Sequence, residues 1–421
     1  MRNRARGPVV QTKVTRRRRT IVVAVLSTIW LLSGGRAGAG ANPEGTVLDQ
    51  TVPILIGHRI DLHSEVLGED RTLLVSRPEG AIGHPLPVII VLDGSFNFAH
   101  TSSTVDLLSR QGLIPPSLVV AVTNTVRERD FTAVPGASPL TGGADRFLEF
   151  IASELVGFLQ QNFDVAPHRT IIGHSLGALL AVHAIVERPE LFSAAIAISP
   201  ALSNDERVPD GLAPLSSRAA TAFASRARQP MTLFITVSDG EQRQWLEDLG
   251  TVLHVLERHT PEGFSWRLER MAGENHTSTV HRSVYDGLRW IHSDWNTDDL
   301  LADGDLDTVE ARFNQVSARL GVRINPPESL LNRIGYQLLE NGKVEEAIAV
   351  FERAVVLKPS SANTHDSLGE ALERAGKLPG ALRCYRRAVV AAEAADDPRT
   401  PIYRANLDRV EGRLLGDGGR E

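Results

Sequence analysis

The chain has 421 residues, of which 42% are hydrophobic and 23% charged, and its net charge is −6. The length allows two or three domains of ordinary globular composition, and the charge excludes the strongly basic surface typical of nucleic-acid-binding proteins. The single cysteine, Cys384, excludes an internal disulfide and a cysteine-rich zinc site, so that packing alone must stabilise the fold.

Residues 1–41 are predicted to form an export signal. The first 20 residues carry arginines and a lysine but no acid, and the apolar run 21–32 follows. Small residues at 37–39 offer a cleavage site, which is the usual order of a secretory signal. The apolar run is shorter than the roughly 20 residues of a comfortable transmembrane span. We therefore expect a periplasmic or secreted protein, and an uncleaved membrane anchor is the alternative.

Residues 46–295 show the pattern of an α/β domain. Two alternating segments at 60–63 and 71–76 indicate strands at an exposed antiparallel edge. Later apolar runs, as expected of buried strands, are separated by helical periodicity. The predicted strands are 88–92, 118–122, 169–173, 194–199, 231–237 and 266–271, and the predicted helices are 144–163, 176–188 and 283–295. This alternation predicts a mostly parallel sheet covered by helices on both faces.

The remainder of the chain is predicted to be helical. Residues 296–325 begin with an acidic stretch that is typical of a linker. From residue 326 onward, small residues recur at an offset of 34, as Gly335 and Gly369 do, and Ala347/Ala381 and Ala354/Ala388 repeat the offset. This period is that of the tetratricopeptide repeat. The segment 397–415 would form a capping helix, and so short a stack is expected to lean on the first domain or on another chain.

The sequence Gly173-His174-Ser175-Leu176-Gly177 is the strongest chemical signal. It matches G-x-S-x-G and lies between a predicted buried strand and a predicted helix, the context in which this motif holds a nucleophilic serine in a strained turn. Ser175 is therefore the predicted nucleophile. The backbone N–H of Leu176, at the start of the helix, is one predicted oxyanion donor. The N–H of Ser95, in the Asp93-Gly94-Ser95 turn after the strand 88–92, is the predicted second donor.

A serine hydroxyl needs a base, and in this fold class the acid and then the histidine follow the serine along the chain. His276 is the predicted base because it lies in a loop, 273–278, between the last strand and the last helix. His281 is the rival candidate, and His183 lies within the helix of the nucleophile and points away.

The acid is open between two carboxylates. Asp239 follows the strand 231–237 and is the first choice to orient the imidazole of His276. Glu241 lies two residues further on and is the second choice, while Asp248 and Glu274 are weaker rivals.

Several motifs together resemble the esterases of the α/β-hydrolase superfamily, which include siderophore esterases of the enterochelin type and esterase D-like enzymes. The resemblance covers residues 50–295 and is carried by six short segments. These are Leu92-Asp93-Gly94, 129–132, 142–147, 173–177, Ile198-Ser199-Pro200 and Glu274-Asn275-His276. It implies ester hydrolysis through Ser175 and His276 with an acyl-enzyme intermediate. The repeat tail departs from the usual pattern of this family.

The predicted function is cleavage of a carboxylic ester by a Ser175–His276–Asp239 triad, without a metal or organic cofactor. The alternatives are a siderophore trilactone esterase, in which Arg127 and Arg129 would attract an anionic iron chelate, and a non-catalytic hydrolase fold that acts through its repeats. A small-molecule ester is the expected substrate. A protein partner or self-association is expected through the tail, and no nucleic acid is expected.

Overall fold

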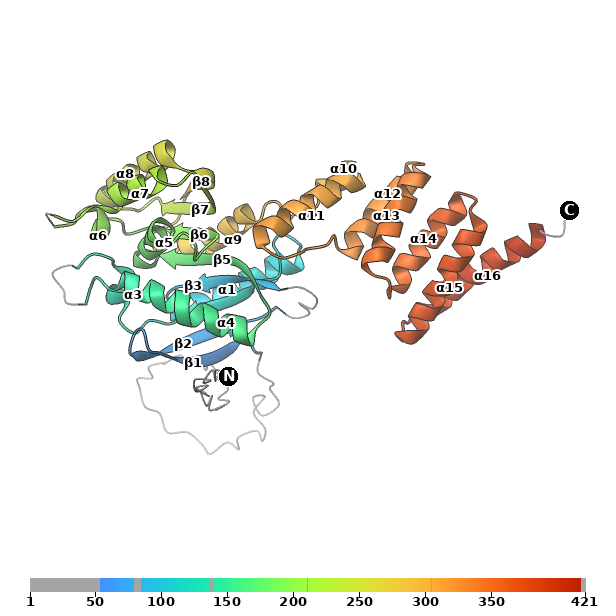
Figure 1. The fold of residues 1–421 in the computed structure, drawn as a ribbon, viewed down its shortest axis with the longest axis horizontal. Coiled ribbons are helices and arrows are strands. Elements are labelled where there is room, and N and C mark those ends of the chain that lie inside the picture. The colour runs from blue at the N-terminus through green and yellow to red at the C-terminus, as the bar shows by residue number, and fades with distance from the viewer. Residues whose placement is uncertain (1–53, 79–84, 136–139, 210, 304, 418–421) are drawn as a thin grey trace, which may run out of the picture.

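The computed structural model describes residues 54–78, 85–135, 140–209, 211–303 and 305–417 (Figure 1). The predicted export signal, residues 1–41, lies outside the described residues. Within the described ranges, no helix combines the length and the apolar content needed to cross a lipid bilayer.

The first domain is built on a sheet of eight strands in the order β1-β2-β4-β3-β5-β6-β7-β8. Strands β3 to β8 run parallel to their neighbours in this set, and β2 joins both β1 and β4 in antiparallel pairs. The bounds are β1 His58–Ser64, β2 Glu69–Ser76, β3 Leu86–Val91, β4 Leu118–Val122, β5 Val165–His174, β6 Ala194–Ile198, β7 Arg228–Ser238 and β8 Glu262–Met271. The predicted mostly parallel sheet with an antiparallel edge is confirmed.

Helices cover both faces of this sheet (Figure 1). In β3, Val88 and Ile90 belong to one apolar core and Ile89 and Val91 to the other, because successive strand residues point to opposite faces. Helices α1 (Gly94–Arg110) and α9 (Thr279–Ile291) pack on the second core. The first core is covered by α2 Arg127–Phe131, α3 Ala144–Glu149, the π-helical turn 150–155, α4 Val156–Asn162, α5 Leu176–Glu187, α7 Leu215–Ala224 and α8 Arg243–His259.

Two of the predicted helices of this domain differ in detail from the sequence expectation. The predicted helix 144–163 is present but contains a π-helical turn, Phe150–Leu155, in its middle. The last helix of the domain begins at Thr279, four residues before the predicted start at Ser283. Both residues are polar but fully buried, and the Ser283 hydroxyl donates to the backbone carbonyl of Thr279 at 2.7 Å. Helical periodicity does not detect a first turn whose polar groups satisfy one another.

The acidic stretch predicted as a linker is largely helical. It forms α10 (Leu300–Asp303) and α11 (Leu306–Leu320). The side chain of Asp305 caps α11 by accepting from the backbone N–H groups of Asp307 and Thr308. Helix α11 shares one apolar core with the helices that follow it, so the two domains are connected by packed structure.

One polar cluster, which we call the joint, connects α11 to the sheet domain. Arg319 of α11 donates to the carboxylate of Asp294 at 2.6 and 2.8 Å, and its Nη1 lies 3.2 Å from Nδ1 of His292. The rings of His168 and His292 are 5.6 Å apart, and both side chains are buried. Burial lowers the pKa of His168 to about 3, with the charges of Arg319 and Arg169 acting in the same direction. Burial also lowers the pKa of His292 well below its ordinary value.

The C-terminal helices form the predicted repeats. Their bounds are α12 Glu328–Glu340, α13 Val344–Leu357, α14 Ala362–Arg374, α15 Leu378–Ala394 and α16 Thr400–Asp417. A Cβ at Gly335 would lie 2.4 Å from the ring of Phe351, and one at Gly369 would lie 2.8 Å from the ring of Tyr385. Both the glycines and the rings are offset by 34 residues, so the sequence period is a repeated packing contact.

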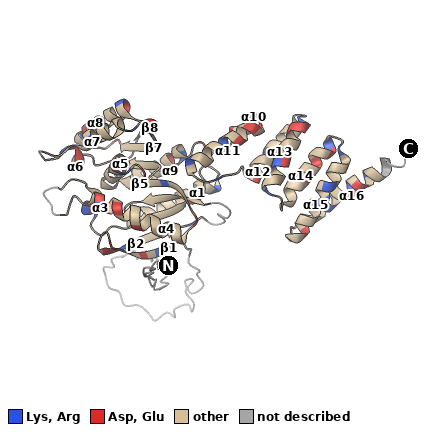
Figure 2. Ribbon diagram, viewed as in Figure 1, with Lys and Arg blue, Asp and Glu red and all other residues tan. Residues whose placement is uncertain are grey.

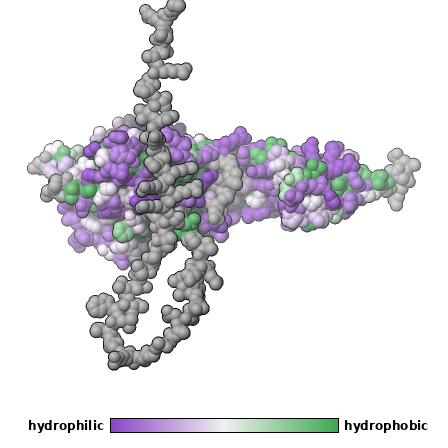
Figure 3. Space-filling view, turned by 90° about the horizontal axis from the view of Figure 1, so that it is seen from below, coloured by the Kyte–Doolittle hydropathy of each residue, from purple (hydrophilic) through white to green (hydrophobic). Residues whose placement is uncertain are grey.

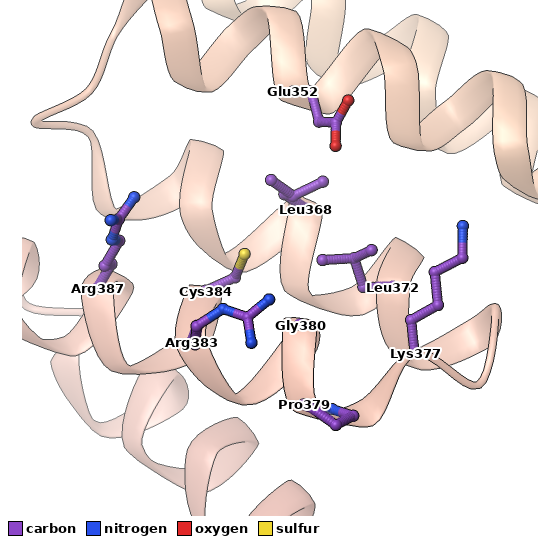
Figure 4. Close-up of a pocket in the computed structure, with 9 residues that line it drawn as sticks. All are labelled: Glu352, Leu368, Leu372, Lys377, Pro379, Gly380, Arg383, Cys384 and Arg387. Atoms are coloured by element: carbon purple, nitrogen blue, oxygen red, sulfur yellow. The ribbon is translucent and has the colours of Figure 1, made fainter.

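A groove lies between α13, α14 and α15, and both apolar and charged side chains line it, with Glu352 as an acidic residue among basic ones (Figure 4). One pocket of about 490 Å³ has Leu368, Leu372 and Cys384 at its floor, and Arg387 joins it to a second pocket of about 660 Å³. We call the two together the repeat groove. Elsewhere acidic and basic side chains are interspersed over both domains (Figure 2), and on the face seen in Figure 3 apolar residues are scattered among hydrophilic ones.

Candidate active site

Ser175 lies in the tight turn between β5 and α5. Its backbone has φ 57° and ψ −115°, a conformation that costs a non-glycine residue free energy and that is typical of functional sites. A Cβ at Gly173 would lie only 2.1 Å from the carbonyl oxygen of Gly177, so glycine is required there for strand and helix to approach. The Ser175 N–H donates to the carbonyl of Ile198 at 2.9 Å, which ties the turn to the neighbouring strand β6.

The two predicted oxyanion donors both lie in the first turn of a helix. Leu176 is the first residue of α5, and Ser95 lies in the first turn of α1. Backbone N–H groups of a first helical turn have no acceptor within their own helix and can donate to an anion. Gly94 lets α1 begin against β4, since a Cβ there would lie 2.9 Å from the backbone of Val122.

Asp93 anchors the start of α1. It has φ 54° and a buried side chain, which accepts from Asn124 at 2.5 Å and from Arg127 at 2.6 and 2.9 Å. The same Arg127 donates through Nη2 to the carbonyl of His174 at 3.1 Å. One arginine therefore connects the loop that carries Ser95 to the turn that carries Ser175.

His276 lies in the loop between β8 and α9, as predicted. The loop is shaped locally by Asn275, whose side-chain oxygen accepts from the N–H groups of Thr277 and Ser278 at 2.9 and 3.0 Å. The imidazole of His276 is 29% exposed and lies between two other rings. The centroid of His174 is 4.7 Å away and that of Trp245 is 4.9 Å away. This neighbourhood holds the imidazole on two sides and leaves it partly open to solvent.

Glu241 is the carboxylate that contacts His276. Its two oxygens lie 3.2 and 3.1 Å from Nδ1 of the imidazole, and its side chain is only 3% exposed. The hydroxyl of Ser238 donates to the same carboxylate at 2.9 Å. Burial raises the pKa of Glu241, but the contacts with Ser199, His276 and Ser238 outweigh burial and bring the pKa below its ordinary value. Glu241 is therefore ionised at neutral pH, as an imidazole-orienting carboxylate must be.

Asp239 does not contact His276, contrary to the first choice from the sequence. Its carboxylate accepts from Arg270 at 2.6 Å and from the N–H of Gly273 at 2.8 Å. The pKa of Asp239 is lowered first by the Gly273 bond and then by Arg270. The physical reason is the turn after β7, which directs Asp239 toward β8 and brings the residue two positions later to the imidazole.

The weaker candidates are also engaged elsewhere. Asp248 accepts from Ser203 at 2.5 Å, and Glu274 accepts from Ser278 at 2.5 Å. The ring of His281 lies against that of His100, with centroids 5.7 Å apart. The structure therefore brings His276 and Glu241 together and leaves the rivals outside this contact.

The arginines considered for an anionic substrate are occupied by carboxylates. Arg127 is bound to Asp93, and Arg129 donates to Glu69 at 2.6 Å and to Asp130 at 2.8 Å. These pairs do not favour a role for either guanidinium in binding a substrate. Among the described residues there is no group of three or more histidine, cysteine or acidic side chains suited to a metal ion.

His174 and Trp245 belong to the site although neither was predicted from the sequence. His174 is the first of the two variable positions of G-x-S-x-G, and Trp245 lies in the first turn of α8. The one available signal was the spacing of Trp245, which follows Glu241, the second choice for the acid, by four residues. Since α8 begins at Arg243, shortly after Glu241, Trp245 in its first turn lies close to the acid.

Two known esterases are similar to this chain along most of their own length. The chain is 25% identical over 248 residues to the ferri-bacillibactin esterase BesA of Bacillus subtilis, covering 52% of this chain and 83% of that protein. It is 27% identical over 248 residues to the siderophore triacetylfusarinine C esterase of Aspergillus fumigatus, covering 50% and 83%.

Solved structures share the fold. An IroE-like serine hydrolase from Shewanella oneidensis matches with a TM-score of 0.61 at 25% identity, over 72% of this chain and 99% of that chain. An uncharacterised protein from Capnocytophaga ochracea matches with a TM-score of 0.66 at 16% identity, over 84% and 99%, which shows the fold alone.

Family models match both parts of the chain. A tetratricopeptide-repeat model matches residues 335–376. The family described as "Putative esterase" matches residues 64–293, which is more than half of the chain. The chain therefore belongs to this esterase family, and it is a carboxylic ester hydrolase with a C-terminal repeat region.

Proposed function

We propose that Ser175, His276 and Glu241 form the catalytic triad of this ester hydrolase. The contact of the buried Glu241 carboxylate with Nδ1 of His276 carries the proposal. A carboxylate at Nδ1 fixes the tautomer in which Nε2 is unprotonated and can accept a proton. The strained turn at Ser175 presents the hydroxyl, and the first turns of two helices supply donors for the oxyanion.

The reaction follows from these roles. His276 takes the proton of the Ser175 hydroxyl as the oxygen attacks the ester carbonyl, and Glu241 stabilises the imidazolium. The N–H groups of Leu176 and Ser95 stabilise the tetrahedral oxyanion. The imidazolium then protonates the leaving alkoxide, which leaves an acyl-enzyme. A water molecule, activated by His276, releases the acid and restores Ser175.

The test is Ser175→Ala, with Ser217→Ala as a matched control because Ser217 is exposed on α7. We expect the first variant to lose about 10⁴-fold or more in kcat on a p-nitrophenyl short-chain ester, since members of a triad act as a unit. The control should keep wild-type activity. Near-wild-type turnover by a folded Ser175→Ala variant would overturn the proposed nucleophile.

For the substrate, we propose an ester of a siderophore. The support is that the two curated relatives above are named as siderophore esterases and align along most of their length. Purified protein should be tested on ferric and iron-free trilactone siderophores beside simple alkyl and aryl esters. A kcat/KM for a ferric siderophore that exceeds those of the simple esters would support the proposal, and hydrolysis of simple esters alone would contradict it.

For the repeats, we propose a binding surface for a protein with acidic side chains, either a second copy of this chain or another protein. Arg383 and Arg387 line the repeat groove and outnumber its acidic residue, Glu352 (Figure 4). In the described part of the chain neither arginine forms an ion pair with a carboxylate. Lys377 and Arg386 also line it but are paired with Glu345 and Glu411 at 2.7 and 2.8 Å.

The double substitution Arg383→Glu/Arg387→Glu tests this surface. Sedimentation velocity at low and high salt reports on self-association. A salt-sensitive dimer that the double variant loses would identify the second copy as the partner. A monomer under all conditions would leave another acidic protein as the partner. Loss of ester hydrolysis in the folded double variant would contradict a separate binding surface.

We also propose that the protein is exported, on the basis of the basic, apolar and small-residue order of residues 1–41. Mass spectrometry of the protein produced in a bacterial host should find a mature chain that begins between Gly38 and Asn42. An intact N-terminus in the membrane fraction would favour the anchor instead.

A further inference from the structure

The nucleophile turn and the loop of His276 are connected by one side chain, that of His174. Its Nε2 lies 2.7 Å from the backbone carbonyl oxygen of His276. A carbonyl oxygen only accepts hydrogen bonds, so Nε2 carries the proton and donates. His174 is the residue directly before Ser175, and this bond therefore joins the base to the nucleophile's own turn.

The backbone of His174 is itself held in place by Arg127. Its backbone carbonyl accepts from Nη2 of Arg127 at 3.1 Å, and Arg127 is fixed by two hydrogen bonds to the buried Asp93. Burial lowers the pKa of His174 below its ordinary value, which keeps the imidazole neutral at neutral pH. A neutral ring can lie against the imidazole of His276, at 4.7 Å between centroids and tilted by 46°, without the repulsion of two positive charges.

The loop of His276 needs such a connection. Its other hydrogen bonds are largely internal, as in the turn formed by Asn275 and Ser278, or lie at its base, where the N–H of Asp239 donates to the carbonyl of Glu274 at 3.2 Å. Those bonds shape the loop but do not fix its position relative to Ser175. Glu241 orients the ring of His276, and the bond from His174 fixes the backbone from which that ring extends.

We propose that His174 is a positioning residue, which sets the distance between base and nucleophile through its hydrogen bond to the backbone carbonyl of His276. The inference rests on the proposed triad. It assigns no chemical step to His174 itself. A displacement of about 1 Å between reacting groups can reduce the rate about 100-fold, so a single tether at this place matters for kcat rather than for substrate binding.

The decisive comparison is His174→Gln against His174→Asn. Both side chains are neutral amides, but only that of glutamine extends far enough to place its N–H near the position of the histidine Nε2. We expect His174→Asn to lower kcat on a p-nitrophenyl ester about 10- to 100-fold, with KM within about twofold. His174→Gln should recover most of the loss. Because the two variants share their chemistry, a general effect of losing the ring would impair both.

A spectroscopic readout separates positioning from stability. The proton on Nδ1 of His276, shared with Glu241, should give a downfield imidazole N–H resonance that shifts or broadens in His174→Asn and persists in His174→Gln. Equal impairment of the two variants, or a rise in KM at unchanged kcat, would overturn the proposal. An inactive Ser175→Ala variant together with wild-type kcat in His174→Asn would overturn positioning alone, whereas an active Ser175→Ala variant would overturn the triad.

Discussion

Glu241 and His276 are 35 positions apart in the chain, and their side chains meet with Nδ1 at 3.1 and 3.2 Å from the two carboxylate oxygens. Glu241 lies between the end of β7 and the start of α8, and His276 follows β8. Strands β7 and β8 are parallel neighbours, so both residues emerge at the same edge of the sheet. Parallel pairing of these two strands is the physical origin of the contact.

Replacement of the acid should separate the two candidates. We expect Glu241→Gln to lower kcat about 10³- to 10⁴-fold, because the amide no longer stabilises the imidazolium and can favour the wrong tautomer. Asp239→Asn should keep kcat within about threefold, since its carboxylate is engaged with Arg270 and Gly273. Steady-state kinetics on a p-nitrophenyl ester measures both, and a severe loss in Asp239→Asn alone would restore the first choice from the sequence.

Replacement of the base should be as damaging as replacement of the nucleophile. We expect His276→Ala to lose about 10⁴-fold or more in kcat. His281→Ala is the matched control, and it should be mild because His281 is exposed on α9 and lies against His100. Kinetics of both variants under the same conditions tests the assignment, which would fail if His281→Ala were the severe change.

The joint should make stability depend on pH. The folded-state pKa of His168 is about 3, below the unfolded value of about 6.5, so the unfolded chain binds a proton first as the pH falls. Stability contributed by this group is therefore complete above about pH 6.5 and decreases as the pH falls toward 3. The free energy of unfolding should fall by about 2 kcal/mol from His168 alone between pH 7.5 and 5.

Urea denaturation of His168→Gln at these two pH values tests the effect. The variant should show a smaller loss of stability on acidification than the wild type, because glutamine does not titrate. His254→Gln, on the exposed face of α8, is the control and should behave as the wild type does. An unchanged pH dependence in His168→Gln would show that other groups govern acid unfolding.

Arg319 should contribute to the attachment of the repeats. Its guanidinium binds Asp294 through two hydrogen bonds and lies against His292. The Arg319→Ala substitution removes the guanidinium and leaves the partly buried carboxylate of Asp294 without its partner. We expect the free energy of unfolding to fall by about 1–3 kcal/mol and the Tm to fall by several degrees. Arg323→Ala is the control, because Arg323 is exposed and its side chain, within the residues that the structure describes, donates only to Asn325. Equal thermal melting of the two variants would contradict a stabilising joint.

The sequence by itself determined the elements whose signals are local. Buried strands appear as continuous apolar runs because both faces of each strand are covered. The turn at Ser175 is identified by Gly173 and Gly177, since a Cβ at Gly173 would collide with the helix that follows. The period of 34 in the repeats is the spacing at which Gly335 and Gly369 meet aromatic rings from the next helix.

Only the tertiary structure decided which groups from distant segments meet. Asp239 and Glu241 follow the same strand, and no local pattern distinguishes them, because the choice depends on how the turn after β7 faces the loop after β8. The roles of His174 and Arg127 depend likewise on contacts between segments far apart in the chain. The helix at residues 306–320 was not predicted, because the segment that begins with the acidic stretch was interpreted as a linker. Its apolar face is recognised only in the structure, where it packs into the core shared with the following helices.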